Sequence, residues 1–241
     1  MATTIWPAGF YFQRVVMRKV LSIVLTLTLS LFIISGAIAV PILFRSLYYL
    51  QIESLNLVEE TGLSRETIKE AYDEMMDYCI HGGPGSGYEF GTGQLKWSQW
   101  GKTHFDDVAK LFLLDIRILE ISAAILLVFI IAKVISKKEL TGRFLDHGPL
   151  FWGPVVLLSA FVLVGAFALI DFDSFFVKFH QLFFPGKDNW IFDPNVDEII
   201  RILPENLFRN FAILIVLLIL IMCTLSITID LKIGRKSKSK Q

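Results

Sequence analysis

The sequence predicts an all-α membrane protein with four transmembrane helices and a small extracytoplasmic cap formed by two outer loops. Its 241 residues are 54% hydrophobic and 19% charged, with a mean hydropathy of +0.59. Soluble domains carry about a quarter charged residues, so a soluble or disordered chain is excluded. The 23 Lys and Arg balance the 23 Asp and Glu, which excludes a nucleic-acid partner. The two cysteines form no CxxC pair and predict no redox chemistry.

Four apolar segments are long enough to cross a bilayer, which takes about 20 residues in a helix. The second is the least obvious, because only residues 121–132 are free of charge. Its flanking Glu120 and Lys133 can snorkel to the headgroups and lengthen the span at both ends. One integral membrane domain over residues 1–241 is expected, with spans at 20–44, 118–135, 150–170 and 210–229.

The distribution of charge predicts the orientation. Residues 1–19, 133–147 and 230–241 together carry 12 Lys and Arg but only three Asp and Glu. Lys and Arg are retained on the cytoplasmic side, so both termini are expected there. Residues 45–117 and 171–209 then form the extracytoplasmic loops, and any active site faces outward.

The first apolar segment could instead be a cleaved signal peptide. Ala37-Ile38-Ala39 resembles a processing site after a basic region. However, the apolar run before it exceeds the usual length of 7 to 15 residues and continues to Phe44. An uncleaved helix is therefore expected.

The first outer loop contains a helix signal. Ser64 can cap a helix whose apolar face includes Ile68, Met75 and Cys79. The Gly-rich stretch 81–87 ends this helix and is expected to be a linker, because it lacks the GK[ST] ending of a phosphate-binding loop.

The end of this loop leads into the second span. Trp97 and Trp100 are typical of the headgroup region, so this piece is expected to rest on the bilayer surface. Thr103 and Asp106 resemble a capping box. The second transmembrane helix is therefore expected to begin at Thr103, with His104 in its first turn.

The second outer loop is rich in phenylalanine. Ser174 is expected to cap a short, mostly apolar helix that carries His180 and ends at Pro185. Residues 196–203 predict a brief amphipathic helix, and Pro204 is placed to begin the final span.

Two of the four histidines are candidates for chemistry. His81 and His147 lie where solvated or capping roles are usual, whereas His104 and His180 lie at the outer boundary of the membrane. Histidine ionises near pH 6.5, so a mostly neutral ring can act as a general base. A second histidine can return the proton to a leaving group. The alternative, non-catalytic interpretation is that both histidine side chains only anchor the loops at the membrane interface.

Zinc binding is the competing interpretation of the same residues. His104, His180 and either Asp106 or Asp107 include acceptable ligands, but there is no HExxH motif. The sequence also lacks a GxSxG motif, so it predicts no serine nucleophile. Acid–base chemistry without a metal or other cofactor is therefore preferred, since an outward-facing site has no access to ATP, acyl-CoA or nicotinamide cofactors.

Two long blocks resemble a known family. GQLKWSQWGKTHFDDVAKLF (Gly93–Phe112) and FHQLFFPGKDNWIFDPNVDEIIRILPENLF (Phe179–Phe208) are similar to the bacterial lipoprotein intramolecular transacylase family, Lit. The resemblance implies a cell-membrane enzyme of low-GC Gram-positive bacteria. Such enzymes move the sn-2 acyl chain of a diacylglyceryl-modified lipoprotein to the α-amine of its N-terminal cysteine, giving the lyso form. His104 and His180 match the two functional histidines of the family.

This chemistry suggests supporting roles for other residues. Asn189 or Trp190 are candidates to stabilise an oxyanion, and Asp106 or Asp107 to orient a histidine. A non-enzymatic scaffold or lipid-binding protein and a zinc-dependent hydrolase are the alternative functions. Several aromatic residues are expected to form an acyl-chain groove, and the alternative is that they only anchor the loops in lipid. These residues are Trp97, Phe175, Phe176, Phe179, Phe183 and Phe184.

Overall fold

A computed structural model describes residues 8–137 and 139–238, and every regular element in these residues is helical. Four of the described helices are long and apolar enough to cross a membrane, as expected for an integral, multi-pass protein. The membrane boundaries within them stay predictions. Of the segments predicted to be cytoplasmic, residues 1–7, Lys138 and residues 239–241 lie outside the described residues.

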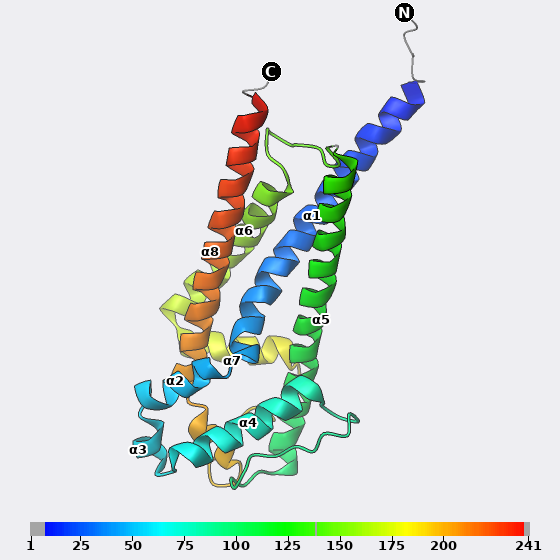
Figure 1. Cartoon of the computed structure of the whole chain (residues 1–241). Helices are drawn as coiled ribbons and strands as arrows, with labels where there is room; N and C mark the ends of the chain where they lie inside the picture. Colours follow the sequence, from blue (N-terminus) through cyan, green and yellow to red (C-terminus); the bar gives the residue numbers. More distant parts are fainter. Residues whose placement is uncertain (1–7, 138, 239–241) are drawn as a thin grey trace, which may run out of the picture. The chain divides into compact units, whose positions relative to one another are not determined.

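The helices follow one another along the chain as Figure 1 shows. The four long helices are α1 (Ala8–Leu43), α5 (Gln99–Ser136), α6 (Pro149–Ile170) and α8 (Glu205–Lys238). The shorter ones are α2 (Ser46–Ser54), α3 (Leu57–Thr61), α4 (Arg65–His81), α7 (Phe172–Phe183) and the 3₁₀ helix η1 (Glu198–Ile202).

The chain forms two compact units. Unit 1 comprises Met1–Ile34, Ile118–Val162 and Ile219–Gln241, and unit 2 comprises Ser35–Arg117 and Leu163–Leu218. Unit 2 therefore contains both predicted outer loops together with the adjoining turns of the long helices.

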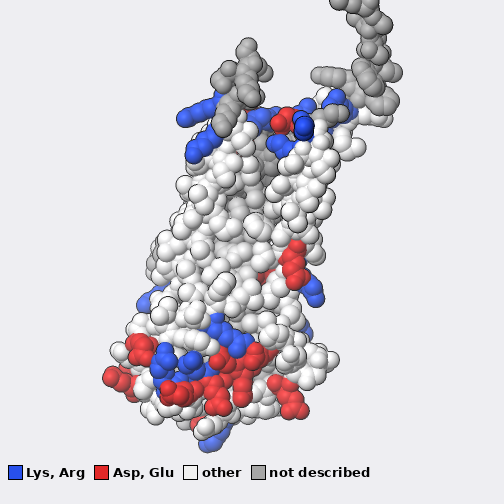
Figure 2. All heavy atoms as spheres, in the orientation of Figure 1, with Lys and Arg blue, Asp and Glu red and all other residues white. Residues whose placement is uncertain are grey.

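In unit 1, polar contacts join the helices inside an apolar surface. Ser30 Oγ donates to the carbonyl oxygen of Gly153 at 2.9 Å. Asp230 is 2% exposed and accepts from Arg143 at 2.9 Å and from His147 Nδ1 at 3.1 Å. Figure 2 shows Lys and Arg gathered over the ends of this unit's helices and the segment between α5 and α6.

Unit 2 has a continuous apolar core, to which α4 contributes its buried face. The predicted cap of α4 is confirmed, because Ser64 Oγ accepts from Thr67 N at 3.1 Å. Tyr48 stacks on Tyr72 at a centroid distance of 3.6 Å and donates to Ile202 O. The core joins side chains from both outer loops, including Ile52, Ile68, Met75, Phe90, Leu95, Phe105, Ile199, Ile202 and Leu207.

The predicted start of α5 at Thr103 is wrong. The helix begins at Gln99, and Ser98 Oγ accepts from Gly101 N at 2.9 Å. Asp106 cannot close a capping box, since it binds Lys102 Nζ at 2.9 Å instead. His104 consequently lies in the second turn of the helix and not in the first.

The predictions for the second loop also need correction. The helix α7 begins at Phe172 and is capped by Asp171, whose Oδ1 accepts from Ser174 N at 3.0 Å, so Ser174 is not the cap. The helix expected at 196–203 is the shorter η1, because the Asp197 side chain binds another segment. Pro204 was expected to begin the final span, but α8 begins one residue later, at Glu205.

Candidate active site

His104 and His180 come together inside unit 2. His104 lies in the second turn of α5 and His180 in the last turn of α7, and their ring centroids are 5.8 Å apart. The two side chains are only 6% and 8% exposed. Because like charges at this separation repel, protonation of both rings at once is disfavoured.

Two polar contacts connect the two outer loops that carry the histidines. Asp197 is buried and accepts from Ser98 N at 2.6 Å and from Ser98 Oγ at 2.9 Å. Lys187 Nζ lies 2.5 Å from Asp107 Oδ2. Each link joins the α5 end of the first outer loop to a residue of the second.

Aromatic rings enclose the histidine pair. The ring of His104 lies edge-on to Phe184 at 4.9 Å and to Phe192 at 5.5 Å. His180 stacks on Trp190 at 4.6 Å. The imidazoles therefore face an apolar environment with little room for bulk water.

The hydrogen bond of His180 indicates its tautomer. Its Nδ1 lies 2.8 Å from the carbonyl oxygen of Phe176, one turn earlier in α7. A carbonyl oxygen only accepts, so Nδ1 carries the hydrogen and Nε2 of the neutral ring keeps its lone pair. Burial lowers the pKa of His180 below its usual value near 6.5, although the Phe176 carbonyl partly offsets this effect. The ring is therefore a neutral base at pH 7.

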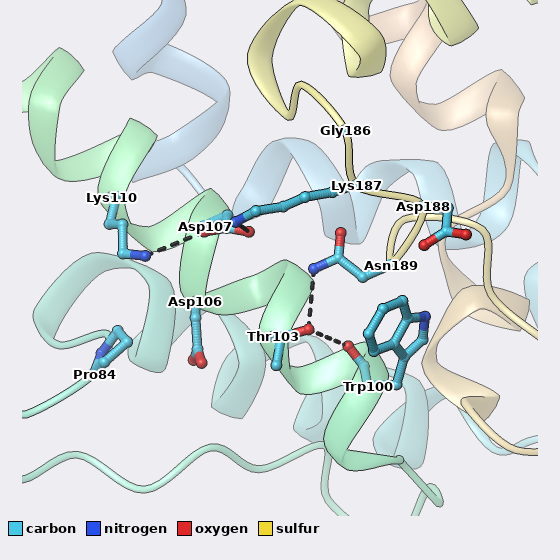
Figure 3. A pocket seen from close by; sticks show the side chains of 10 residues that line it. All are labelled: Pro84, Trp100, Thr103, Asp106, Asp107, Lys110, Gly186, Lys187, Asp188 and Asn189. Carbon is cyan, nitrogen blue, oxygen red and sulfur yellow. Dashed lines mark hydrogen bonds and ion pairs between the residues drawn. The ribbon is translucent and has the colours of Figure 1, made fainter.

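Asn189 forms a hydrogen bond with Thr103, the residue that precedes His104 (Figure 3). Asn189 Nδ2 donates to Thr103 Oγ1 at 3.0 Å, and Thr103 Oγ1 donates to the carbonyl oxygen of Trp100 at 2.6 Å. Within the described residues, Asn189 Oδ1 and His104 Nδ1 are buried without a hydrogen-bond partner. Unpaired buried polar atoms are uncommon and call for an explanation.

A polar cavity of about 350 Å³ adjoins Thr103 and Asn189. It opens among charged side chains of α5 and of the loop after α7, as Figure 3 shows. Neither His104 nor His180 lines it. Its lining residues are Pro84, Trp100, Thr103, Asp106, Asp107, Lys110, Gly186, Lys187, Asp188 and Asn189.

The two carboxylates next to His104 bind lysines. Asp106 accepts from Lys102 Nζ and from the Tyr78 hydroxyl, while Asp107 binds Lys187. No hydrogen bond joins either carboxylate to a histidine in the part of the chain that the structure describes. Orientation of a histidine by Asp106 or Asp107 therefore stays a prediction without a direct contact to support it.

The predicted aromatic groove divides into near and distant members. Phe179 lies 5.7 Å from the His180 ring and 4.6 Å from Phe183, and both phenylalanines are exposed. Trp97 instead is exposed and packs edge-on against Phe90 at 5.2 Å. The structure places Phe179 against His180, whereas no ring contact joins Trp97 to either histidine among the described residues.

Trp190 is close to the site but its donor is occupied. The indole Nε1 donates to the carbonyl oxygen of Lys187 at 3.1 Å, so it is not free to bind an oxyanion in this arrangement.

Sequence reasoning missed Phe192 and gave Thr103 only a capping role. Both residues lie within the two distinctive sequence blocks, and the position of Thr103 next to His104 was the available signal.

Other reactive groups are poorly placed for catalysis. Burial raises the pKa of the Cys79 thiol to about 12, so it is protonated and not nucleophilic at neutral pH. Among the residues described, no three His, Cys, Asp or Glu side chains group closely enough to hold a metal ion. A catalytic zinc site generally needs three protein ligands.

Comparison with known proteins identifies related sequences and structures. The model of the family Lipoprotein intramolecular transacylase Lit matches residues 23–208. The membrane integral lipoprotein intramolecular transacylase Lit from Bacillus cereus superposes with a TM-score of 0.78 at 25% identity, over 92% of this chain and 97% of that chain. Two variants of that protein, with a histidine replaced by arginine or by alanine, give TM-scores of 0.76 and 0.75. Both are 25% identical and cover 97% and 96% of this chain and 98% and 99% of theirs. No curated protein matches the sequence.

Proposed function

The chain belongs to the lipoprotein intramolecular transacylase Lit family, and from this premise we propose the reaction that it catalyses. It moves the sn-2 acyl chain of a diacylglyceryl-modified lipoprotein to the α-amine of the N-terminal cysteine. The product is the lyso form of the lipoprotein. The observation that carries the proposal is the buried pair of His104 and His180, with ring centroids 5.8 Å apart.

The reaction converts an ester into an amide and needs no acyl donor. The α-ammonium, whose ordinary pKa is about 7.7 to 8.0, first loses a proton to His104 and becomes the nucleophile, and His104 passes that proton to solvent. The amine attacks the ester carbonyl, and Nε2 of His180 takes the second proton from nitrogen. Collapse of the intermediate breaks the ester C–O bond, and the glyceryl oxygen receives a proton from the imidazolium. One proton is released per turnover.

His104 is the preferred base and His180 the preferred acid. The available Nε2 lone pair of His180 suits proton exchange with the glyceryl oxygen. Because nucleophile and electrophile belong to one molecule, the site mainly has to fold the substrate into an attack geometry. Such positioning can contribute up to roughly 7 to 11 kcal/mol. No enzyme nucleophile is needed.

The aromatic side chains supply the acyl-chain groove. Phe179 lies next to His180, Phe183 packs against Phe179, and both expose apolar surface, which suits a fatty acyl chain. The predicted orientation places this groove on the extracytoplasmic face of the bacterial cell membrane, where lipoproteins carry their lipid. Membrane lipid then surrounds the helices on all sides.

Replacement of either histidine tests the proposal. His104→Gln and His180→Gln should each abolish conversion of diacyl to lyso lipoprotein, because proton transfer at either oxygen or nitrogen is lost. The measurement is mass spectrometry of the N-terminal lipopeptide from a host that lacks other N-acylation. His81→Gln is the matched control, since His81 is exposed at the end of α4 and should leave conversion unchanged.

The same assay separates the alternatives. A scaffold or lipid-binding protein would show no histidine dependence, so normal conversion in both variants would contradict the proposal. A zinc-dependent hydrolase would lose activity with a chelator and contain stoichiometric metal. We expect chelation to have no effect.

A further inference from the structure

We propose that Asn189 is a positioning residue for His104, and this inference rests on the proposed function of His104 as the base. During the reaction, Asn189 Oδ1 accepts the hydrogen on His104 Nδ1. That bond selects the tautomer in which Nε2 has a free lone pair. The proposal joins two atoms that otherwise lack partners in the described structure: Asn189 Oδ1, an acceptor, and His104 Nδ1, which can donate.

Thr103 determines which end of the Asn189 amide is the acceptor. The Thr103 hydroxyl has one hydrogen, and that hydrogen goes to the carbonyl oxygen of Trp100. Thr103 Oγ1 can therefore only accept from Asn189, so Nδ2 must face Thr103. Oδ1 consequently points the other way, as Figure 3 shows, and the amide cannot flip without losing a bond.

The chain segment that carries Asn189 surrounds His104. Phe184 before it and Phe192 after it both contact the His104 ring, at 4.9 Å and 5.5 Å. The Asn189 side chain is 3% exposed and binds the residue that precedes His104. Both unpaired atoms are buried, so a hydrogen bond between them would give each one a protein partner.

Comparison with His180 explains why His104 needs this partner. His180 Nδ1 bonds to the carbonyl oxygen four residues earlier, that of Phe176. The equivalent carbonyl for His104 belongs to Trp100, and it already accepts the Thr103 hydroxyl. Asn189 replaces that backbone acceptor, and both histidines then present Nε2 to the reacting groups.

Kinetics of three substitutions test the role. Asn189→Ala should lower kcat roughly 10- to 100-fold with little change in KM, the range seen when a partner that orients a histidine is removed. Asn189→Asp keeps an acceptor and favours the protonated ring, so it should retain more activity and move the acidic limb of the kcat profile to higher pH. Thr103→Val should also lower kcat, and Thr103→Ser should restore it. Asn195→Ala removes an exposed amide and is the control.

A spectroscopic readout makes the test independent of turnover. Nitrogen NMR of ¹⁵N-histidine protein in detergent, with an unreactive ether analogue of the diacyl lipopeptide bound, should show the Nδ1–H tautomer of His104 in the wild type and a loss of that tautomer in Asn189→Ala. An unchanged tautomer, or an effect of Asn189→Ala on KM alone, would overturn the inference. If His104→Gln were fully active, the proposed function would fail, while the NMR result would still decide the role of Asn189.

Discussion

His180 shows how a buried base can be oriented without a carboxylate. Its Nδ1–H is held by a backbone carbonyl of its own helix, which adds no charge to the apolar site. A carboxylate partner would favour the imidazolium, whereas a carbonyl leaves a weakly basic, neutral ring. In the proposed reaction, the ring would then take up and release a proton within one cycle.

The lowered pKa of His180 predicts a pH-dependent stability. The unfolded chain binds this proton more readily than the fold does, so the free energy of unfolding should fall as pH drops below about 6.5 towards the folded pKa. His180→Gln should remove part of this loss, because glutamine does not titrate. Melting temperatures in detergent at pH 7.5 and 5.5 provide the measurement. An equal pH effect in wild type and variant would contradict the assignment, and the exposed His81→Gln serves as control.

For individual residues, the sequence predicted which histidines are candidates for catalysis but not which atoms accept hydrogen bonds beside them. His104 and His180 were recognisable because both lie next to apolar spans on the same predicted side. The acceptors Phe176 O and Trp100 O could not be predicted, since they depend on where each helix begins. The contact between Asn189 and Thr103 joins residues 86 positions apart, and no local pattern marks it.

At the scale of elements, a single carboxylate joins the start of α5 to the loop before η1. Asp197 is 4% exposed and accepts two hydrogen bonds from Ser98, whose hydroxyl also caps α5. The link is reinforced by Glu198 N, which donates to the carbonyl oxygen of Lys96 at 2.9 Å. The position of His104 therefore depends on a residue of the other outer loop.

Removal of this carboxylate should destabilise unit 2. Asp197→Ala leaves the half-buried donors of Ser98 without their charged acceptor, which costs about 1–3 kcal/mol. We expect a lower melting temperature and a reduced rate of lyso-lipoprotein formation. Asp193→Ala is the comparison, because Asp193 is exposed and its carboxylate, among the described residues, accepts only from Asn195 in its own turn. Equal melting temperatures for the two variants would argue against a role for the link.

Helix starts were the least predictable feature of the elements. The capping-box pattern at Thr103 and Asp106 failed because Asp106 has stronger partners in Lys102 and Tyr78. The short helix α3 was not predicted at all. Its flanking Asn56 and Gly62 have φ of 52° and 68°, and these residue types adopt such angles most easily, so the signal was present in the sequence.

At the scale of the whole molecule, long apolar helices were predictable from composition alone. Lipid requires every backbone polar group to be bonded within the segment, so a charge-free run of this length has few alternatives to a helix. The meeting of the two outer loops was not predictable, because it depends on packing among Phe105, Phe192 and η1.

The charge distribution predicts which segments face outward. Gln94→Cys in the first outer loop should react with a membrane-impermeant maleimide in intact cells, whereas Glu139→Cys should react only after lysis. Both positions are exposed. The native Cys79 and Cys223 are each 1% exposed and should contribute little background. The reverse labelling pattern would invert the predicted topology.

The rings around the histidines have one more consequence. An activated ester next to a general base is normally lost to water, which would release a free fatty acid and leave the cysteine amine bare. Phe184 and Phe192 pack against the His104 ring and Trp190 against the His180 ring, which leaves little room for water beside the imidazoles. In the proposed reaction, such an enclosure would leave the amine of the substrate without a competing nucleophile, so exclusion of water would determine the product without a dedicated selective contact.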